Sequence, residues 1–453
     1  MVHMSSTTTE APGSSSPAPG SASGAEPTGY KLAPLYATLP IANIALYMLW
    51  LGVGVYMLPV QVIHITGAPD PNALKWPTFW GALLATVGNP LFGKLSDMTR
   101  SRFGRRSPYI LFCAVVGAVA LIIQAQASSI AMVGLTWGVI QFIMNGYQAA
   151  LTAVMPDRVP AKKYGIFSAM IGLGVPAATI LASLIIAGVD LNLIGIDVRF
   201  GGFDGRFMNP VDGGEQGFYL IAAILVAAAL LFVVLSPDKS TKDMPREKAD
   251  IIGFVKGFWV DPRQHADFVI ALFSRLGVML GYFLILTFNY FILVSYIKIP
   301  PNEVGPKLGT LTIIGGVATI VAALLIGPIV DKVGRVKPFV IASGIGAALS
   351  LMVPMIWATE NGMVAFQILN GFFFGVYLAV DMALITQVLP RPEDVGKDMG
   401  LINIANAGPQ IAAPFLAPFI VSDLDLGYEA LFPVAGAIAL AGALLALFVK
   451  RVK

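Results

Sequence analysis

Long apolar runs alternate with short polar or charged segments along almost the whole chain. A helix needs about 20 predominantly apolar residues to cross the hydrocarbon core of a bilayer. Dividing the sequence at its charges and at clusters of Pro and Gly predicts twelve such helices, at roughly 36–61, 77–96, 108–127, 130–155, 164–189, 216–236, 267–297, 306–330, 338–358, 363–389, 398–421 and 428–449. The eleventh helix, which Pro and Gly interrupt, has the weakest pattern.

Two segments interrupt this pattern. Residues 1–33 are rich in Ser, Thr, Pro, Gly and Ala, so they cannot bury enough surface to offset their chain entropy and are predicted to form a disordered tail. They also lack the basic start and apolar core of a signal peptide. The charged stretch 237–266 is predicted to be a linker between two halves, 34–236 and 267–453, with six helices each.

Composition supports a membrane protein. Only 12% of the residues are charged and 56% are hydrophobic, whereas about 25% of a soluble protein is charged. The single cysteine, Cys113, excludes intramolecular disulfides. No His, Cys and carboxylate cluster has metal spacing, and no phosphate-binding loop occurs. We therefore expect an all-α membrane protein in contact with the lipid bilayer, with no metal, cofactor, nucleic-acid partner or enzymatic activity.

The distribution of cations predicts the orientation, because cytoplasmic loops carry an excess of Lys and Arg. With the N-terminus in the cytoplasm, all but six of the 29 cations fall in cytoplasmic segments. The exceptions are Lys75, Arg199, Arg206, Lys298 and Lys307 in outer loops and Arg275 inside the seventh helix. We therefore expect a multi-pass protein of the cell membrane with both termini in the cytoplasm.

A charged turn occurs at the same place in each predicted half. The first copy is GKLSDMTRSRFGRRSPYIL (93–111) and the second is GPIVDKVGRVKPFVI (327–341). Matching positions are Gly93 and Gly327, Asp97 and Asp331, Gly104 and Gly334, Arg105 and Arg335, and Pro108 and Pro338. Repeated halves are the architecture of many secondary transporters.

Two interpretations of this turn are open. A carboxylate at a helix end can bind Arg or helix amides in one conformation and release them in another, so the turns can act as a cytoplasmic latch. Its members would be Gly93, Asp97, Arg102, Gly104, Arg105, Arg106, Gly327, Asp331, Gly334 and Arg335. Alternatively, the cations only set topology. Topology does not require Asp and Gly at matched offsets, so the latch is favoured.

These turns resemble the signature loop of the major facilitator superfamily. The expanded first copy is similar to the form in the glycoside-pentoside-hexuronide:cation symporters and the sucrose:proton symporters. A second patch, YLAVDMALITQVLP (377–390) with GKDMGLINIANAGPQIAAP (396–414), is similar to bacterial members of the sucrose-carrier group. The resemblance implies twelve helices in two pseudo-symmetric six-helix halves, alternating access, and transport of a sugar together with a cation.

An ionisable residue inside a membrane helix costs a few kcal/mol, so it indicates function by default. Asp381 lies nine residues before Pro390, roughly 13 Å from that helix end, and shares one helical face with Asn370 and Tyr377. We expect this face to line the substrate path and Asp381 to carry a proton. The alternative is a structural carboxylate paired with a neighbour such as Arg275. Arg275 itself can instead extend to the headgroups.

Other polar positions are candidate ligands for sugar hydroxyls, although such residues also bond helices to each other. The fourth helix carries Gln141, Asn145, Gln148 and Thr152 on one face. Further candidates are Asn43, Tyr47 and Trp50 in the first helix, Asn289 in the seventh, and Asn403, Asn406 and Gln410 in the eleventh. Tyr47 and Trp50 can stack on a sugar ring.

The sequence departs from its relatives at the cation-coupling positions. Sodium-coupled glycoside symporters carry carboxylates where this chain has Ala85 and Asn89, which argues against sodium coupling. Plant sucrose carriers carry an Arg and an Asp where it has Gln148 and Ala153. Asp381 therefore remains the candidate proton carrier.

The resemblance and the polar positions together predict proton-coupled uptake of a sugar, an α-glucoside disaccharide such as sucrose. One alternative is an uncoupled facilitator, or an exporter of another small solute. An alternative of another class is a non-transporting solute sensor, but the chain shows no large cytoplasmic extension that a sensor would use.

Overall fold

The computed structural model describes residues 32–160, 163, 167, 170–171, 174–202, 206–208, 213–242, 263–388 and 408–450. Elements of the first half are α1 (Leu32–Leu51), η1 (Gly52–Met57), α2 (Leu58–Thr66), α3 (Pro71–Met98), α4 (Ser107–Ala125), α5 (Ile130–Thr152), α6 (Val154–Arg158), α8 (Gly174–Ala182), η3 (Ser183–Ala187), β1 (Val189–Asp190), η4 (Leu191–Ile194), β2 (Arg199–Phe200), η5 (Arg206–Met208) and α9 (Glu215–Leu235). Those of the second are α11 (Ala266–Phe291), η6 (Ile292–Tyr296), α12 (Pro301–Val333), α13 (Lys337–Ser350), α14 (Val353–Ile356), α15 (Glu360–Gln387), η8 (Phe419–Asp423), η9 (Tyr428–Ala430), α17 (Leu431–Leu445) and η10 (Ala446–Phe448). Residues 408–418 are also helical.

Nine helical segments in the described part of the chain are long and apolar enough to cross a membrane. They coincide with the predicted helices one, three, four, six to ten and twelve. The second predicted helix is present as α3, whose Lys, Asn and Asp residues make it less apolar. The fifth and eleventh are described only in part, over 174–187 and 408–423. The chain is therefore a helical membrane protein, consistent with twelve spans.

Side chains at the helix ends explain several boundaries. Asp70, Ser129 and Thr359 each accept a hydrogen bond from a backbone amide in the first turn of α3, α5 and α15. Such caps satisfy amides that have no partner within the helix. At the other end, α12 stops at Gly334, whose φ of +66° is left-handed and suits glycine.

Short π-helical segments occur at matching places in the two halves. In the described residues, η1 and η6 follow the first helix of each half, and η3 and η8 follow the fifth. A π-segment in a helix often marks a functional site, because one extra residue disturbs the regular hydrogen bonding. The halves thus share an irregularity in addition to the repeated turn.

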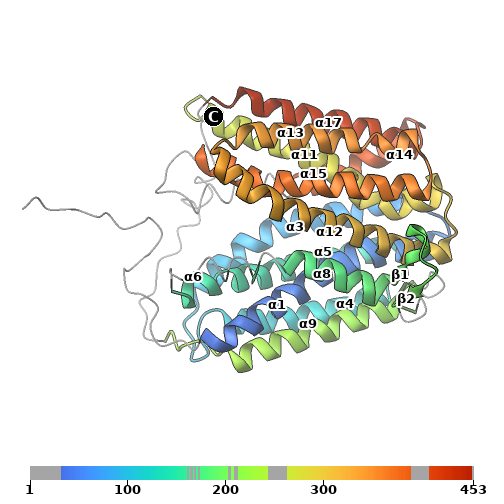
Figure 1. Cartoon of the computed structure of the whole chain (residues 1–453). Helices are drawn as coiled ribbons and strands as arrows, with labels where there is room; N and C mark the ends of the chain where they lie inside the picture. The colour runs from blue at the N-terminus through green and yellow to red at the C-terminus, as the bar shows by residue number, and fades with distance from the viewer. Residues whose placement is uncertain are drawn as a thin grey trace, which may run out of the picture.

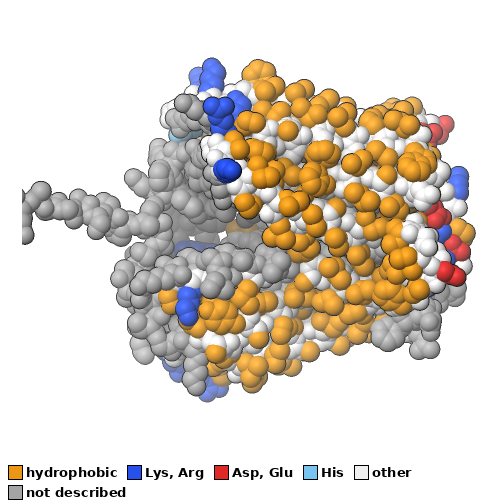
Figure 2. Space-filling model, in the orientation of Figure 1, with side chains coloured by type: hydrophobic (Ala, Val, Ile, Leu, Met, Phe, Trp, Pro, Cys, Tyr) orange, Lys and Arg blue, Asp and Glu red, His pale blue; other side chains and the backbone are white. Residues whose placement is uncertain are grey.

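The helices form two groups (Figure 1). Helices of 32–235 lie in the lower part of the view and those of 266–448 in the upper part, with α12 along the boundary. Figure 2 shows hydrophobic side chains over the broad middle of this face, with most of the visible Lys and Arg at one end and the visible Asp and Glu, beside a few further cations, at the other. We call the end with the 99–106 loop the basic end and the end with the β1–β2 hairpin the opposite end.

Candidate substrate pathway

Three helices of the first half bring polar side chains together. Gln148 of α5 accepts a hydrogen bond from Asn89 Nδ2 of α3 at 3.3 Å and also bonds the Tyr47 hydroxyl of α1. All three side chains are half-buried. In the sequence, Asn89 was considered only as a position where relatives carry a cation-binding carboxylate. Its membership of this cluster was therefore missed by sequence reasoning.

Aromatic residues extend this cluster along α1. The rings of Tyr47 and Trp50 meet edge to face with centroids 5.4 Å apart. The indole Nε1 of Trp50 is buried and has no hydrogen-bond partner among the described residues. A buried donor without a partner costs about 1–3 kcal/mol, so a bound solute with an acceptor oxygen would relieve a real penalty.

Two of the predicted site residues on α1 and α5 form hydrogen bonds within their own helices. Asn43 donates to the Leu39 carbonyl and Asn145 to the Gln141 carbonyl, both at 2.9 Å. Asn43 is buried, Gln141 is half-buried, and Thr152, the last residue of the predicted stripe, is exposed. These residues lie on the predicted helices, but among the candidates on α1 and α5 the described side-chain contact between helices joins Tyr47 to Gln148.

The second half contains a small cavity of about 40 Å³ with polar side chains in its lining. It is lined by Tyr282, Ile285, Leu286, Asn289, Leu351, Phe366, Gln367 and Asn370. Asn370 donates to Ser350 Oγ at 3.0 Å, whereas the Oδ1 atom of Asn289 is buried with no described partner. A cavity of this size with an unpartnered acceptor can hold a water molecule or one hydroxyl group. Tyr282 and Gln367 were not singled out in the sequence.

Asp381 is held inside the second half. Arg275 Nη1 of α11 forms an ion pair with one carboxylate oxygen, and the Tyr377 hydroxyl donates to the other at 2.9 Å. Asp381 is 1% exposed and Arg275 is 6% exposed, so Arg275 does not extend to the headgroups. The pairing anticipated as the alternative interpretation of Asp381 is therefore present in this structure.

The surroundings of this pair are apolar. Phe268, Val380 and Leu384 belong to the hydrophobic cluster around it. Asp381 lies six residues before the end of α15, about 9 Å along the axis, which is nearer the basic end than the sequence suggested. Asn403 and Asn406 lie outside the described residues, and Gln410 is exposed.

Charged residues at the basic end form a compact network. Arg106 pairs with Asp97 of α3 at 2.6 Å and with Asp157 of α6 at 2.7 Å, and it also donates to Ser96 Oγ. Arg105 forms a two-pronged contact with Asp157, at 2.5 and 3.0 Å. Burial alone lowers the pKa of Arg105, but attraction to the Asp157 charge and the hydrogen bonds that Arg105 donates to Asp157 raise it overall.

Asp238, which follows α9, completes this network. Its Oδ2 accepts from the backbone amides of Arg105 and Arg106, both at 3.1 Å, and pairs with Arg158 at 3.3 Å. Negative charge at the start of α4 is favourable, because a helix N-terminus carries partial positive charge. Gly104 has a φ of +79°, and a Cβ there would overlap the Asp238 carboxylate. Sequence reasoning missed Asp157 and Asp238.

The remaining residues predicted for the cytoplasmic latch make fewer contacts with this charged network. Gly93 lies in α3 beside Ala149, and Arg102 stacks on Phe103 with 4.7 Å to the ring centroid. In the second copy, Gly334 ends α12 and Arg335 is exposed. Gly327 and Asp331 lie in α12, where their side-chain surroundings are outside the description. The two copies share the left-handed glycine.

At the opposite end, polar contacts join the two halves. Thr310 Oγ1 of α12 donates to the Asp190 carbonyl at 2.9 Å and accepts from the Asp190 amide at 2.8 Å. Arg199 pairs with the buried carboxylate of Asp190 at 2.8 Å and approaches Glu303 of α12 at 3.7 Å. The hydrogen bond to Asp190 raises the pKa of Arg199. Because α12 also packs on η3, we call this contact between α12 and the η3–β1 segment the seam.

A second, aromatic contact joins the halves. The ring of Phe415 lies 5.6 Å from Trp76 and 4.9 Å from Phe79, both in α3. Lys75 Nζ lies 5.2 Å from the same ring, within cation–π range. The first residues of α3 thus contact the 408–418 helix through aromatic rings. In the seam, by contrast, α12 contacts the first half through hydrogen bonds to the backbone and through charged side chains.

Solved transporters share this arrangement. The nucleoside transporter NupG superposes with a TM-score of 0.67 at 14% identity, covering 92% of this chain and all of that one. A bacterial homologue of the human lysosomal transporter Spinster, inward-facing and occupied, gives 0.66 at 14% identity over 94% of this chain and 98% of its own. A POT family transporter in complex with a thioalcohol-conjugated peptide gives 0.67 at 12% identity over 91% and 95%. At these identities the likeness shows the fold.

The family is shown by the sequence itself. None of the curated proteins compared with this chain matches it. The sequence model of the family described as the Major Facilitator Superfamily, however, matches residues 41–305 and again residues 271–453. Together with the transporter fold, this match makes the protein a membrane transporter of small molecules rather than an enzyme. The chain belongs to the major facilitator superfamily.

Proposed function

We propose that this transporter carries a neutral, polyhydroxylated solute, an α-glucoside disaccharide such as sucrose, by alternating access. The cluster of Tyr47, Asn89 and Gln148 carries the proposal, because it joins three helices with hydrogen-bonding side chains that bear no charge. Trp50 adds an apolar ring face and a donor that has no partner among the residues that the structure describes. Hydroxyl groups need donors and acceptors, whereas an ionic solute would require a countercharge.

The basic end is proposed to face the cytoplasm, with both chain termini on that side. Two observations support this. The 99–106 loop and the Lys residues after α9 gather at that end, as expected for cytoplasmic loops. The seam joins the halves at the other end. The structure then corresponds to a state closed toward the outside.

A screen of radiolabelled disaccharides in proteoliposomes tests the substrate class. Gln148→Leu should raise the KM for the transported sugar at least tenfold, because a bound hydroxyl loses its hydrogen-bond partner at a half-buried site. Gln126→Leu, an exposed position at the end of α4, is the matched control and should leave KM unchanged. Equal KM values in both variants, or transport of charged solutes only, would refute the proposal.

Uptake is proposed to be coupled to protons through Asp381. Protonation would neutralise the carboxylate, weaken its pairing with Arg275 and let α11 and α15 shift against each other. Asp381→Asn should then abolish accumulation driven by a pH gradient while exchange of labelled for unlabelled sugar continues. Because one unpaired buried charge can unfold the protein, the double variant Arg275→Gln with Asp381→Asn is measured beside it. Full accumulation by either variant would contradict the coupling.

One observation favours a second candidate, an uncoupled facilitator. Asp381 is already neutralised by Arg275 within the apolar core of one half, and its pairing there serves the packing of α11 on α15. A facilitator would equilibrate the sugar to equal concentrations on both sides, and a protonophore would not change that end point. A coupled carrier would accumulate sugar, and the protonophore would discharge it.

A further inference from the structure

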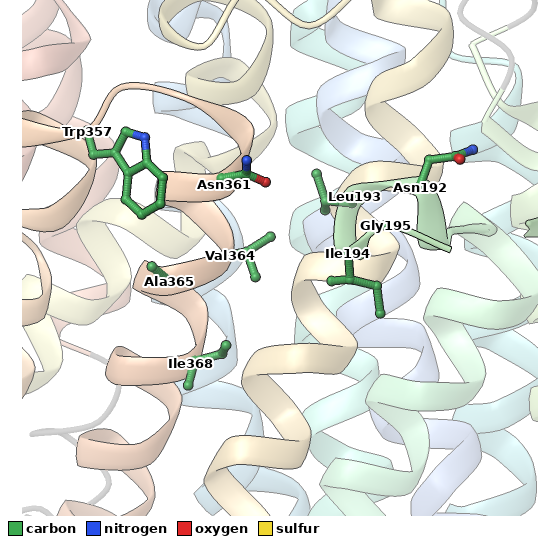
Figure 3. Close-up of a pocket in the computed structure, with 9 residues that line it drawn as sticks. All are labelled: Asn192, Leu193, Ile194, Gly195, Trp357, Asn361, Val364, Ala365 and Ile368. Carbon is green, nitrogen blue, oxygen red and sulfur yellow. The ribbon is translucent and has the colours of Figure 1, made fainter. Parts of the chain in front are cut away.

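A groove of about 540 Å³ opens at the opposite end, outside the polar pathway (Figure 3). One wall comes from the first half and the other from the second. The lining residues are Asn192, Leu193, Ile194 and Gly195 on the first wall and Trp357, Asn361, Val364, Ala365 and Ile368 on the second. Its volume lies within the range of about 300–1,000 Å³ that is typical of small-ligand sites.

The groove is polar at one level and apolar below it. Figure 3 shows the amides of Asn192 and Asn361 at one height, with Ile194, Val364 and Ile368 beneath them. Ile368 lies seven residues after Asn361 in α15, about 10 Å further along the axis. Two amides above an apolar trough match a ligand that has polar groups at one end of a hydrocarbon chain.

The apolar floor continues into the surface that faces the bilayer. Ile368 and Phe372 are 48% and 38% exposed on α15, a helix long and apolar enough to span a membrane. Exposed apolar side chains on such a helix contact lipid tails. Trp357, 49% exposed just before α15, has the position of aromatic residues at membrane interfaces.

We propose that this groove binds a bilayer phospholipid. Its ester carbonyls would accept hydrogen bonds from the Asn192 and Asn361 amides, and the upper part of one acyl chain would lie along Ile194, Val364 and Ile368. Because each half supplies one wall, the lipid contacts both halves only while the seam is closed. A ligand that prefers one state shifts the population toward it, so the lipid stabilises the state closed at the opposite end.

The test uses dioleoylphosphatidylethanolamine titrated into the purified full-length transporter, with bound lipid counted by native mass spectrometry. Ala365→Trp places a large ring in the groove and should reduce the bound fraction at least fivefold. Leu369→Trp adds the same ring on the neighbouring exposed position of α15, outside the groove, and should bind like the wild type. Asn361→Leu, a change at an exposed position, should reduce binding about threefold without altering folding.

A second measurement addresses the stabilisation. The midpoint of thermal unfolding should rise with lipid concentration in the wild type and in Leu369→Trp, and stay constant in Ala365→Trp. Equal lipid binding by all four proteins would overturn the proposal. So would displacement of the lipid by sucrose, because the groove would then be a sugar site.

Discussion

Ion pairs at the two ends of the molecule join different partners. At the basic end, Arg106 connects Asp97 of α3 with Asp157 of α6, all within the first half. At the opposite end, Arg199 lies in the first half and its neighbour Glu303 in the second. The basic-end network can therefore persist when the halves move apart, whereas the seam must break. Contacts that preserve the fold and contacts that hold one conformation are separated in space.

This difference refines the idea of a paired cytoplasmic latch. The described partners of Arg105 and Arg106 lie in α3, in α6 and after α9. These contacts therefore stabilise the packing of elements within the first half. A contact that is made in one state and lost in the other is better sought in the seam. The latch stays a prediction, and three variants sharpen the contrast.

The largest effect is expected at Asp157. Asp157→Ala leaves Arg105 and the buried Arg106 without their shared carboxylate, which should cost about 3 kcal/mol of unfolding free energy. Asp97→Ala removes a 44% exposed partner of the same Arg106 and should cost less than about 1 kcal/mol. Chemical unfolding in detergent measures both. Equal losses would mean that the network does not brace the first half.

A smaller effect on stability, but a larger one on conformation, is expected at Gly309. A Cβ there would overlap the backbone carbonyl of Gly188 across the seam, so Gly309→Ala should cost the closed state about 1–3 kcal/mol. Gly316→Ala is the matched control in the same helix, because its Cβ would lie 3.5 Å from Thr179, an ordinary contact. In a Cys113→Ser background, labelling by a membrane-impermeant thiol reagent of a cysteine at Val189, which is only 3% exposed in β1 of the closed seam, should increase only in Gly309→Ala. No difference between the variants would contradict a closed seam.

The smallest effect is expected at Arg199, whose side chain is 49% exposed. Arg199→Gln removes the cation that approaches Glu303 across the seam and should weaken the closed state by about 1 kcal/mol, roughly fivefold in population. Lys298→Gln removes a cation at the same end and should change nothing measurable, because Lys298 is exposed. The labelling rate of a cysteine at the buried Val189 measures the effect of both variants. Identical rates would show that Arg199 does not hold the halves together.

The sequence was most informative where one physical rule dominates. Apolar length alone places helices, which is why α4 at Ser107–Ala125 and α9 at Glu215–Leu235 agree with the predicted 108–127 and 216–236 within two residues. Exact ends also depend on caps and π-segments. α1 therefore continues through η1 and α2 to Thr66, beyond the predicted end.

The site was less predictable, because side-chain partners depend on which helices touch. The cluster around Gln148 needed Asn89 from α3. The basic-end network needed Asp157 of α6 and Asp238 after α9, which lie about 50 and 130 residues from Arg105 in the sequence. Position just after an apolar run marks both carboxylates as lying at a membrane end, but not as partners of Arg105. The sequence indicated the seam still less, because Asp190 takes part in both of its described hydrogen bonds through backbone atoms, which any residue carries.

Distances between spin labels at both ends test the central contrast most directly. In a Cys113→Ser background, one label pair at Val198 and Met355 reports on the opposite end and one at Phe103 and Phe448 on the basic end, all at exposed positions. The wild type should show a short, narrow distance at the opposite end. Gly309→Ala should lengthen it and shorten the basic-end distance in the same population. The contrast would be contradicted if Gly309→Ala left the opposite-end distance unchanged, or if the distances at the two ends changed independently of each other.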